Sequence, residues 1–227
     1  MFAPWSIFQE IGRNSELTSL GNGKYHASVC IPRIMRNFAV SNNWSVFGMW
    51  DNDNILQVLR SSLGGADVRI LAKEVPCSLL LPRLYDEDIR VARNAAWVLT
   101  HKPITQIRTL PYNDLIDLIM ATPDTSLRRL TLNLMDQLYY PLGILRIMGL
   151  PMDAELMRTD FLDFCLLHMH MPDEPPGVQA LCMKLAHRMC LPYPELLHEF
   201  YETLSLMQPE DCKPGMKHLI NKMKNQQ

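Results

Sequence analysis

The chain has 227 residues, with 22 Lys or Arg and 24 Asp or Glu, so its formal net charge at pH 7 is -2. Hydrophobic residues make up 48% of the sequence and charged residues 20%, a balance that argues against global disorder. The near-neutral charge provides no overall field that would attract nucleic acid or an anionic membrane surface.

The location of the protein follows from its first residues and its cysteines. The first residues lack the basic and continuous apolar regions of a secretory signal, and no window reaches the roughly 18 apolar residues of a membrane span. The six cysteines include no CxxC pair, which indicates reduced, mostly buried thiols rather than a disulfide framework. We therefore expect a cytoplasmic protein.

The first 50 residues differ in character from the rest. No acid occurs between Glu16 and Asp51, and the stretches LGNGKYH and SNNW are typical of turns and loops. Three interpretations fit residues 1–50: a small helical cap, a partly disordered arm, or a leader upstream of a start at Met49. We expect the cap or arm to precede a single repeat domain over residues 51–227.

From about residue 55 onward, the pattern predicts short amphipathic helices and almost no strand. Prolines such as Pro103, Pro123 and Pro141 are expected to stop these helices, because proline has no backbone N–H and disfavours helix in the residue before it. The predicted helices span residues 54–63, 67–75, 78–84, 88–101, 113–121, 125–139, 154–169, 177–190, 194–207 and 213–224.

One pattern recurs along the chain. An aliphatic-arginine pair is followed by apolar or small residues at helical spacing, and an aspartate stands four residues before the arginine. Asp86 or Asp88 for the first such helix, and Asp124 for the second, are expected to cap by accepting hydrogen bonds from the first-turn amides. The first copy contains Asp86, Ile89, Arg90, Ala92, Ala96 and Leu99; the second contains Asp124, Leu127, Arg128, Leu130, Leu134 and Leu138; a weaker third begins at Val178 and Gln179.

This pattern resembles the HEAT repeats of the armadillo/HEAT superfamily, over about residues 67–225. The resemblance implies an all-α fold, a right-handed α-α superhelix (α-solenoid) of stacked antiparallel helix pairs. It also implies that the helix with the aliphatic-arginine pair lines the concave face, and that the protein is a non-enzymatic scaffold or interaction module. The expected partner is another protein, a peptide or a helix, and no cofactor or catalytic residue is expected.

A stripe of side chains lies away from the predicted core face of these helices and is the candidate binding surface. It combines aromatic residues, which would anchor a bound peptide or helix, with arginines, which would pair with acidic residues of that partner. A purely structural role is the alternative for each of them. Trp97 would then pack against a neighbouring helix, Met135 would be buried between repeats, and the arginines would bind aspartates of adjacent turns. The stripe contains Arg90, Arg93, Asn94, Trp97 and His101 from the first copy, and Arg128, Met135 and Tyr139 from the second.

A metal site or an acid-base site is less well supported. In the string CLLHMHM, His168 and His170 would point about 200° apart on a helix, so they cannot chelate one ion together with Cys165. We expect core thiols and a histidine near a helix end instead. The carboxylate pairs Asp160/Asp163 and Glu195/Glu199 have no nearby serine or histidine that would complete a catalytic set.

Nucleic-acid binding is the alternative function. Some HEAT-like proteins are alkylpurine DNA glycosylases with a basic concave surface. The sequence has a partial likeness to such a surface at Arg90, Arg93, Trp97, Arg128 and Arg129. The near-neutral charge and the lack of a recognisable catalytic tryptophan and aspartate argue against it.

Overall fold

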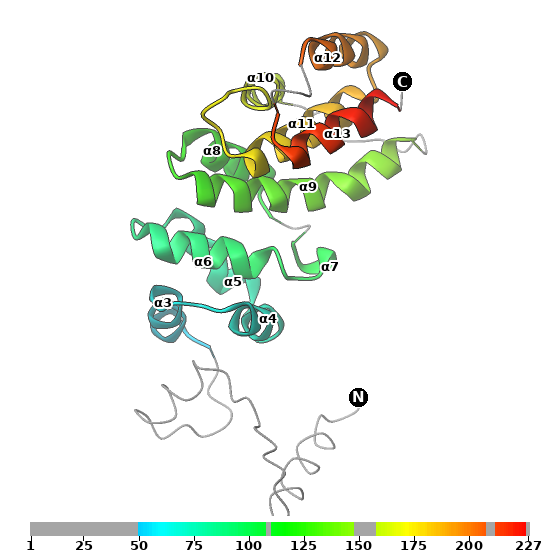
Figure 1. The fold of residues 1–227 in the computed structure, drawn as a ribbon. Helices are drawn as coiled ribbons and strands as arrows, with labels where there is room; N and C mark the ends of the chain where they lie inside the picture. Colours follow the sequence, from blue (N-terminus) through cyan, green and yellow to red (C-terminus); the bar gives the residue numbers. More distant parts are fainter. Residues whose placement is uncertain (1–49, 108–109, 148–157, 208–211, 226–227) are drawn as a thin grey trace, which may run out of the picture. The chain divides into compact units, whose positions relative to one another are not determined.

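The computed structural model describes residues 50–107, 110–147, 158–207 and 212–225, with side chains as far as Tyr139 in the second range (Figure 1). These residues belong to one unit of the chain, Arg33–Gln227. Within the described ranges the chain forms helices and no strand. The prediction for residues 1–50 lies outside the described residues apart from Trp50.

The helices follow one another with short connections. In chain order they are α3 (Asn52–Arg60), α4 (Gly65–Glu74), α5 (Cys77–Leu80), the 3-10 helix η1 (Pro82–Tyr85), α6 (Ile89–Leu99), α7 (Ile104–Ile107), α8 (Tyr112–Ala121), α9 (Thr125–Ile147), α10 (Thr159–His168), α11 (Pro176–Cys190), α12 (Pro194–Leu206) and α13 (Pro214–Lys224).

Each helix predicted from the sequence has a counterpart, with three differences. The segment predicted as one helix over residues 78–84 is two, because Pro82 begins a separate 3-10 turn after α5. The short helix α7 was not predicted, and it follows directly after Pro103. The predicted stop at Pro141 is wrong, since α9 continues to Ile147.

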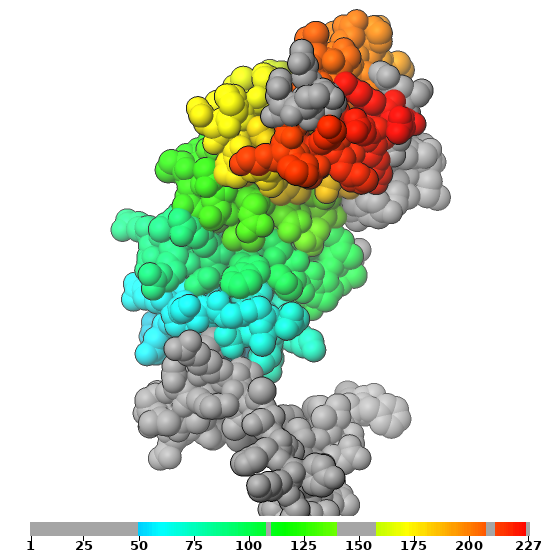
Figure 2. All heavy atoms as spheres, in the orientation of Figure 1, coloured from blue at the N-terminus to red at the C-terminus, as the bar shows by residue number. Residues whose placement is uncertain are grey.

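The helices are arranged as stacked pairs. The second helices of the pairs pack in a row, α6 against α9, α9 against α11 and α11 against α13. Their partners lie against them: η1 against α6, α8 against α9, α10 against α11, and α12 against α13. Figure 2 shows the same order at the surface, where colours pass in bands from cyan to red. This is the all-α stack of antiparallel pairs that the sequence pattern predicts.

The core runs continuously from Ile55 on α3 to Met223 on α13. Three of the buried side chains on α6 are alanines, Ala92, Ala95 and Ala96, which are small enough to allow close packing of neighbouring helices. Ile89, the aliphatic residue that begins the first copy of the repeat pattern and is expected on its core face, is 39% exposed. The buried residues of α6 are Val91, Ala92, Ala95, Ala96, Val98 and Leu99, so this helix is covered on more sides than the sequence pattern predicts.

The described part of the chain includes no helix with both the length and the apolar character needed to cross a membrane.

Candidate functional site

The start of α6 is fixed by two aspartates. Asp88 is the N-cap residue, and its Oδ1 accepts a hydrogen bond of 3.0 Å from the Arg90 N–H. Asp86 accepts one of 3.1 Å from the Asp88 N–H, so it supports the cap from outside the helix. Of the two aspartates offered by the sequence, Asp88 is therefore the cap, and α6, which carries the candidate stripe, begins directly after it.

Three of the predicted stripe residues on α6 bind other helices. The Arg90 Nη1 donates to the Arg60 carbonyl at the end of α3, at 3.5 Å. The Asn94 Nδ2 donates to the Leu59 carbonyl at 2.7 Å and the Ser61 carbonyl at 3.1 Å, at the end of α3. These carbonyls would otherwise lack intrahelical partners. The Arg93 Nε donates to Asp124 at 2.8 Å, and its Nη2 donates to the second oxygen of the same carboxylate. Asn94 and Arg93 therefore join α6 to the helices before and after it.

Arg128 lies in a buried ionic cluster rather than on an open surface. Its Nη1 donates to Glu174, and its Nη2 donates to the Thr122 carbonyl at 2.6 Å. The side chains of Arg128 and Glu174 are only 12% and 7% exposed. His168 completes the cluster, with its Nδ1 at 2.7 Å from Glu174 Oε1 and its ring stacked on Phe164.

Met135 and Tyr139 were predicted to face a partner, and this prediction is wrong. Met135 is 0% exposed and Tyr139 is 5% exposed. The Tyr139 ring meets Tyr112 edge-on, with 6.3 Å between the ring centroids. Burial raises the pKa of Tyr139, and it raises the pKa of Tyr112 to about 12. The physical reason is that α9 is packed between α6 and α11, so the face predicted to be open is covered.

Three further residues of the predicted stripe are accessible, in addition to the partly exposed Arg93 and Asn94. Arg90 and His101 are exposed, and Trp97 between them is half-buried against the core. The His101 Nδ1 lies 3.1 Å from the Trp97 carbonyl and 3.2 Å from Thr100 Oγ1, which holds the ring at the end of α6. We refer to Arg90, Trp97 and His101 as the α6 surface.

The cysteines and histidines give no sign of metal chemistry in the residues that the structure describes, where no group of three or more His, Cys, Asp or Glu side chains could hold an ion. Cys165, Cys182 and Cys190 are buried, and Cys77 and Cys212 are half-buried. Burial, with Cys182 close by, raises the pKa of the Cys165 thiol. The predicted core thiols are confirmed for these three positions, while Cys30 lies outside the described residues.

Sequence reasoning missed several polar side chains that join helix pairs. The Lys102 Nζ donates to the carbonyls of Ala72 and Val75 at the end of α4, at 2.7 and 2.5 Å. The Arg188 Nη1 donates to the Asp136 carbonyl at 2.7 Å and to its carboxylate at 2.5 Å. Arg188 lies in the last turn of α11, 52 positions after Asp136, so spacing along one helix gives no signal for this contact.

The comparisons with known proteins agree with this architecture. The family model described as HEAT repeat domain matches residues 57–227, which is most of the chain. Neither the curated proteins nor the solved structures contain a match to the sequence.

Proposed function

Because the chain belongs to the HEAT repeat domain family, we propose that it is a non-enzymatic interaction module that binds a partner protein or peptide through the α6 surface. The observation that carries the proposal is the position of Trp97. It is half-buried, and two exposed polar residues, Arg90 in the first turn of α6 and His101 just after its last turn, come before and after it in the sequence. Tryptophan and arginine are the residues that most often dominate binding energy at protein interfaces.

The bonds around α6 support this proposal by making the surface rigid. Asn94 ties the helix to the end of α3, and Arg93 ties it to the start of α9. Trp97 also packs against the core with part of its ring system. A partner therefore meets side chains that are already ordered, which lowers the entropy cost of binding. A carboxylate of the partner would pair with Arg90.

The nucleic-acid alternative has less support. Of the arginines that prompted it, Arg93 and Arg128 pair with Asp124 and Glu174. Their charges are therefore largely neutralised within the chain, and they offer little attraction to phosphate groups.

The proposal is tested by crosslinking from the α6 surface in the native cell. A photo-reactive amino acid replaces His101 in the full chain, and the captured protein is purified and titrated against the unmodified chain. Trp97→Ala is expected to weaken this binding by roughly tenfold or more, as truncation of an interface tryptophan does. Arg90→Glu is expected to weaken it as well and to leave the melting temperature unchanged.

Two matched variants serve as controls. Arg69→Glu reverses an exposed arginine of α4, and Leu206→Ala truncates a leucine of α12 that is 82% exposed. Both should change the affinity less than twofold. Unchanged affinity in both Trp97→Ala and Arg90→Glu would refute the proposal, as would capture of duplex DNA in place of a protein. Arg90 is exposed and its guanidinium makes one long hydrogen bond, of 3.5 Å, to the Arg60 carbonyl, so Arg90→Glu keeps the test valid if Trp97→Ala unfolds.

A further inference from the structure

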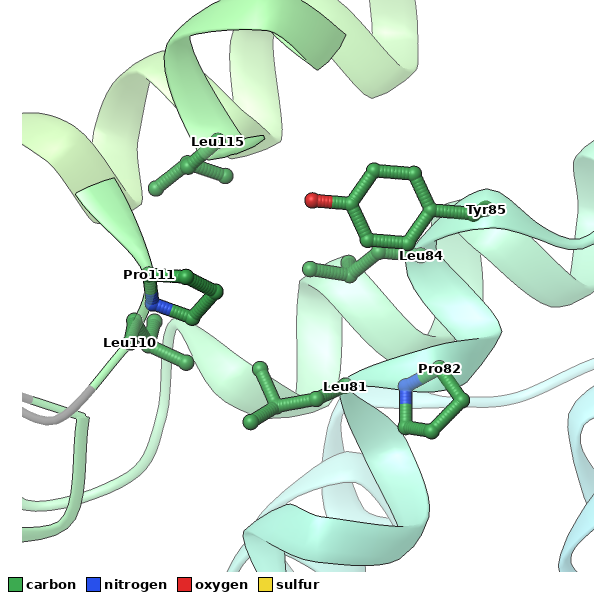
Figure 3. Close-up of a pocket in the computed structure, with 7 residues that line it drawn as sticks. All are labelled: Leu81, Pro82, Leu84, Tyr85, Leu110, Pro111 and Leu115. Atoms are coloured by element: carbon green, nitrogen blue, oxygen red, sulfur yellow. The ribbon is translucent and has the colours of Figure 1, made fainter. Parts of the chain in front are cut away.

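An apolar pocket lies between the first helices of two consecutive pairs, on elements that the proposed function does not use. Its volume is about 140 Å³. One wall is the end of α5 with η1, and the other is the start of α8 (Figure 3). The pocket is lined by Leu81, Pro82, Leu84, Tyr85, Leu110, Pro111 and Leu115.

The local sequence explains why this pocket is apolar. Pro82 begins η1 and Pro111 is the N-cap residue of α8, and neither can present a backbone N–H to the pocket. Leu84, Leu110 and Leu115 are buried and form its inner surface. The hydroxyl of Tyr85 is the one polar side-chain atom among the lining residues. An occupant must therefore be apolar.

Tyr85 forms an exposed wall of the pocket. It is 51% exposed, although a tyrosine ring is a large apolar surface. In Figure 3 its ring stands beside Leu84, and its hydroxyl points across the opening toward the side on which Leu115 lies. The Tyr85 ring thus extends the apolar surface outward from Leu84. An occupant of the pocket would contact the face of this ring.

The volume matches one large side chain. An apolar protein cavity of about 150 Å³ holds a benzene molecule. The pocket, at about 140 Å³, is therefore large enough for one phenylalanine ring or one leucine side chain, but too small for a longer apolar segment.

The charge beside the pocket is negative. Asp114 and Asp117 on α8 are exposed, and both carboxylates raise the pKa of Tyr85 in addition to the effect of its burial, so their field reaches the opening. Asp117 is paired with Arg158, at 2.5 Å. Within the described residues, Asp114 has no ion-pair partner. A cationic group next to the occupant would therefore gain from Asp114.

From this size, lining and charge, we propose that the pocket docks a single phenylalanine or leucine side chain of a partner protein, with lysine or arginine residues next to it in the partner's sequence. The apolar side chain fills the pocket and meets the Tyr85 ring. A flanking basic residue faces Asp114 on α8. The site is separate from the α6 surface, so a partner could bind at one without the other.

The experiment uses the full chain with labelled leucine methyl groups and three short peptides, KKFKK, KKAKK and EEFEE, blocked at both ends. KKFKK should shift the methyl signals of Leu81, Leu84 and Leu110 while leaving those of Leu181 and Leu219 in place. Replacing its phenylalanine by alanine should weaken binding about tenfold or more, because the buried apolar area is lost. EEFEE should bind more weakly than KKFKK.

A charge reversal gives the second arm of the experiment. Asp114→Lys should weaken KKFKK binding by about threefold and strengthen EEFEE binding, in keeping with a solvent-exposed charge interaction. The matched control is Glu195→Lys, which reverses an exposed acid in the first turn of α12 and should change neither affinity. Both substitutions lie on helix surfaces, so folding is expected to be unaffected.

Three results would overturn the proposal. Equal binding of KKFKK and KKAKK would mean that the peptide recognises charge alone. Absence of shifts at the pocket leucines with KKFKK would mean that the pocket does not accept the side chain. Shifts of the pocket methyls on dilution without peptide would assign the pocket to a second copy of this chain.

Discussion

The guanidinium of Arg93 on α6 donates hydrogen bonds to both carboxylate oxygens of Asp124, the residue before α9. The same carboxylate accepts the Leu127 N–H at 2.7 Å, so it also caps α9. Asp124 therefore fixes the start of one helix and joins it to the second helix of the preceding pair. The aspartate of the repeat pattern has two structural roles at this position.

Replacing Asp124 should lower the free energy of unfolding and should make this free energy depend less on pH in the acid range. Arg93 is the main cause that holds the pKa of Asp124 below its ordinary value, against the opposing effect of burial. The folded-state pKa is therefore below the unfolded one, near 3.9, and the stabilisation is present above that value. It is lost as the pH falls through the lower folded pKa. Asp124→Asn keeps a capping oxygen and loses only the charge, so we expect it to reduce the free energy of unfolding at pH 7 by about 0.5–1 kcal/mol.

Urea denaturation at pH 7, 5, 4 and 3 measures this effect. The difference between Asp124→Asn and the unchanged chain should shrink toward pH 3. Arg93→Met also keeps the cap and loses the same ion pair, whose arginine is 42% exposed, so it should cost about as much as Asp124→Asn. An equal loss at every pH would contradict the role given to the ion pair.

Removing one partner of the buried pair of Arg128 and Glu174 should lower the free energy of unfolding strongly. Replacing both partners by apolar residues should lower it little. Glu174→Ala leaves a guanidinium that is 12% exposed without its carboxylate, and we expect a loss of about 3–5 kcal/mol. Arg128 Nε and Glu174 Oε2 are buried and have no hydrogen-bond partner in the described structure, so the pair itself is incompletely satisfied. The double variant Arg128→Met with Glu174→Leu should therefore recover most of the stability, as measured by thermal and urea unfolding. A double variant as unstable as Glu174→Ala would refute this account.

The sequence predicts the local structure well because helix periodicity and caps are local properties. Asp88 and Asp124 cap the helices that they were expected to cap. The exposure of the candidate stripe was harder to predict, because it depends on which helices pack together. Met135 and Tyr139 are covered by neighbours far along the chain.

The partners of the predicted arginines are equally non-local. Arg93 pairs with a residue 31 positions away and Arg128 with one 46 positions away, distances at which spacing along one helix carries no information. Pro141 illustrates a different limit. A proline inside a long helix costs stability but does not always end the helix, and α9 continues beyond it.

Lys102 should stabilise the end of α4 without any acidic partner. Its ammonium group donates to the carbonyls of Ala72 and Val75, and it lies 3.5 Å from Gln106 Oε1. The lysine is 5% exposed, and burial lowers its pKa. We expect Lys102→Met to cost about 2 kcal/mol, because hydrogen bonds from a charged donor to the carbonyls are lost.

Hydrogen exchange and urea unfolding measure the Lys102 effect. Amide protection should decrease in the last turn of α4 more than elsewhere. Lys73→Met, at an exposed position in the same turn, is the matched control and should change stability by less than about 0.5 kcal/mol. Equal effects of the two substitutions would mean that the contacts of Lys102 do not stabilise the fold.

The thiols of α10 and α11 should resist modification until the chain unfolds. Cys165 is 0% exposed and Cys190 is 1% exposed, and burial raises the pKa of Cys190 to about 11. Since the thiolate is the reactive form, both should label slowly with iodoacetamide at pH 8. Cys212 is half-buried and should label sooner, ahead of Cys77, whose pKa is raised by burial. Mass spectrometry of digested samples gives the rate at each cysteine, and added urea should bring Cys165 and Cys190 to one common rate. Labelling of Cys165 as fast as Cys212 in native buffer would mean that this part of the stack opens readily.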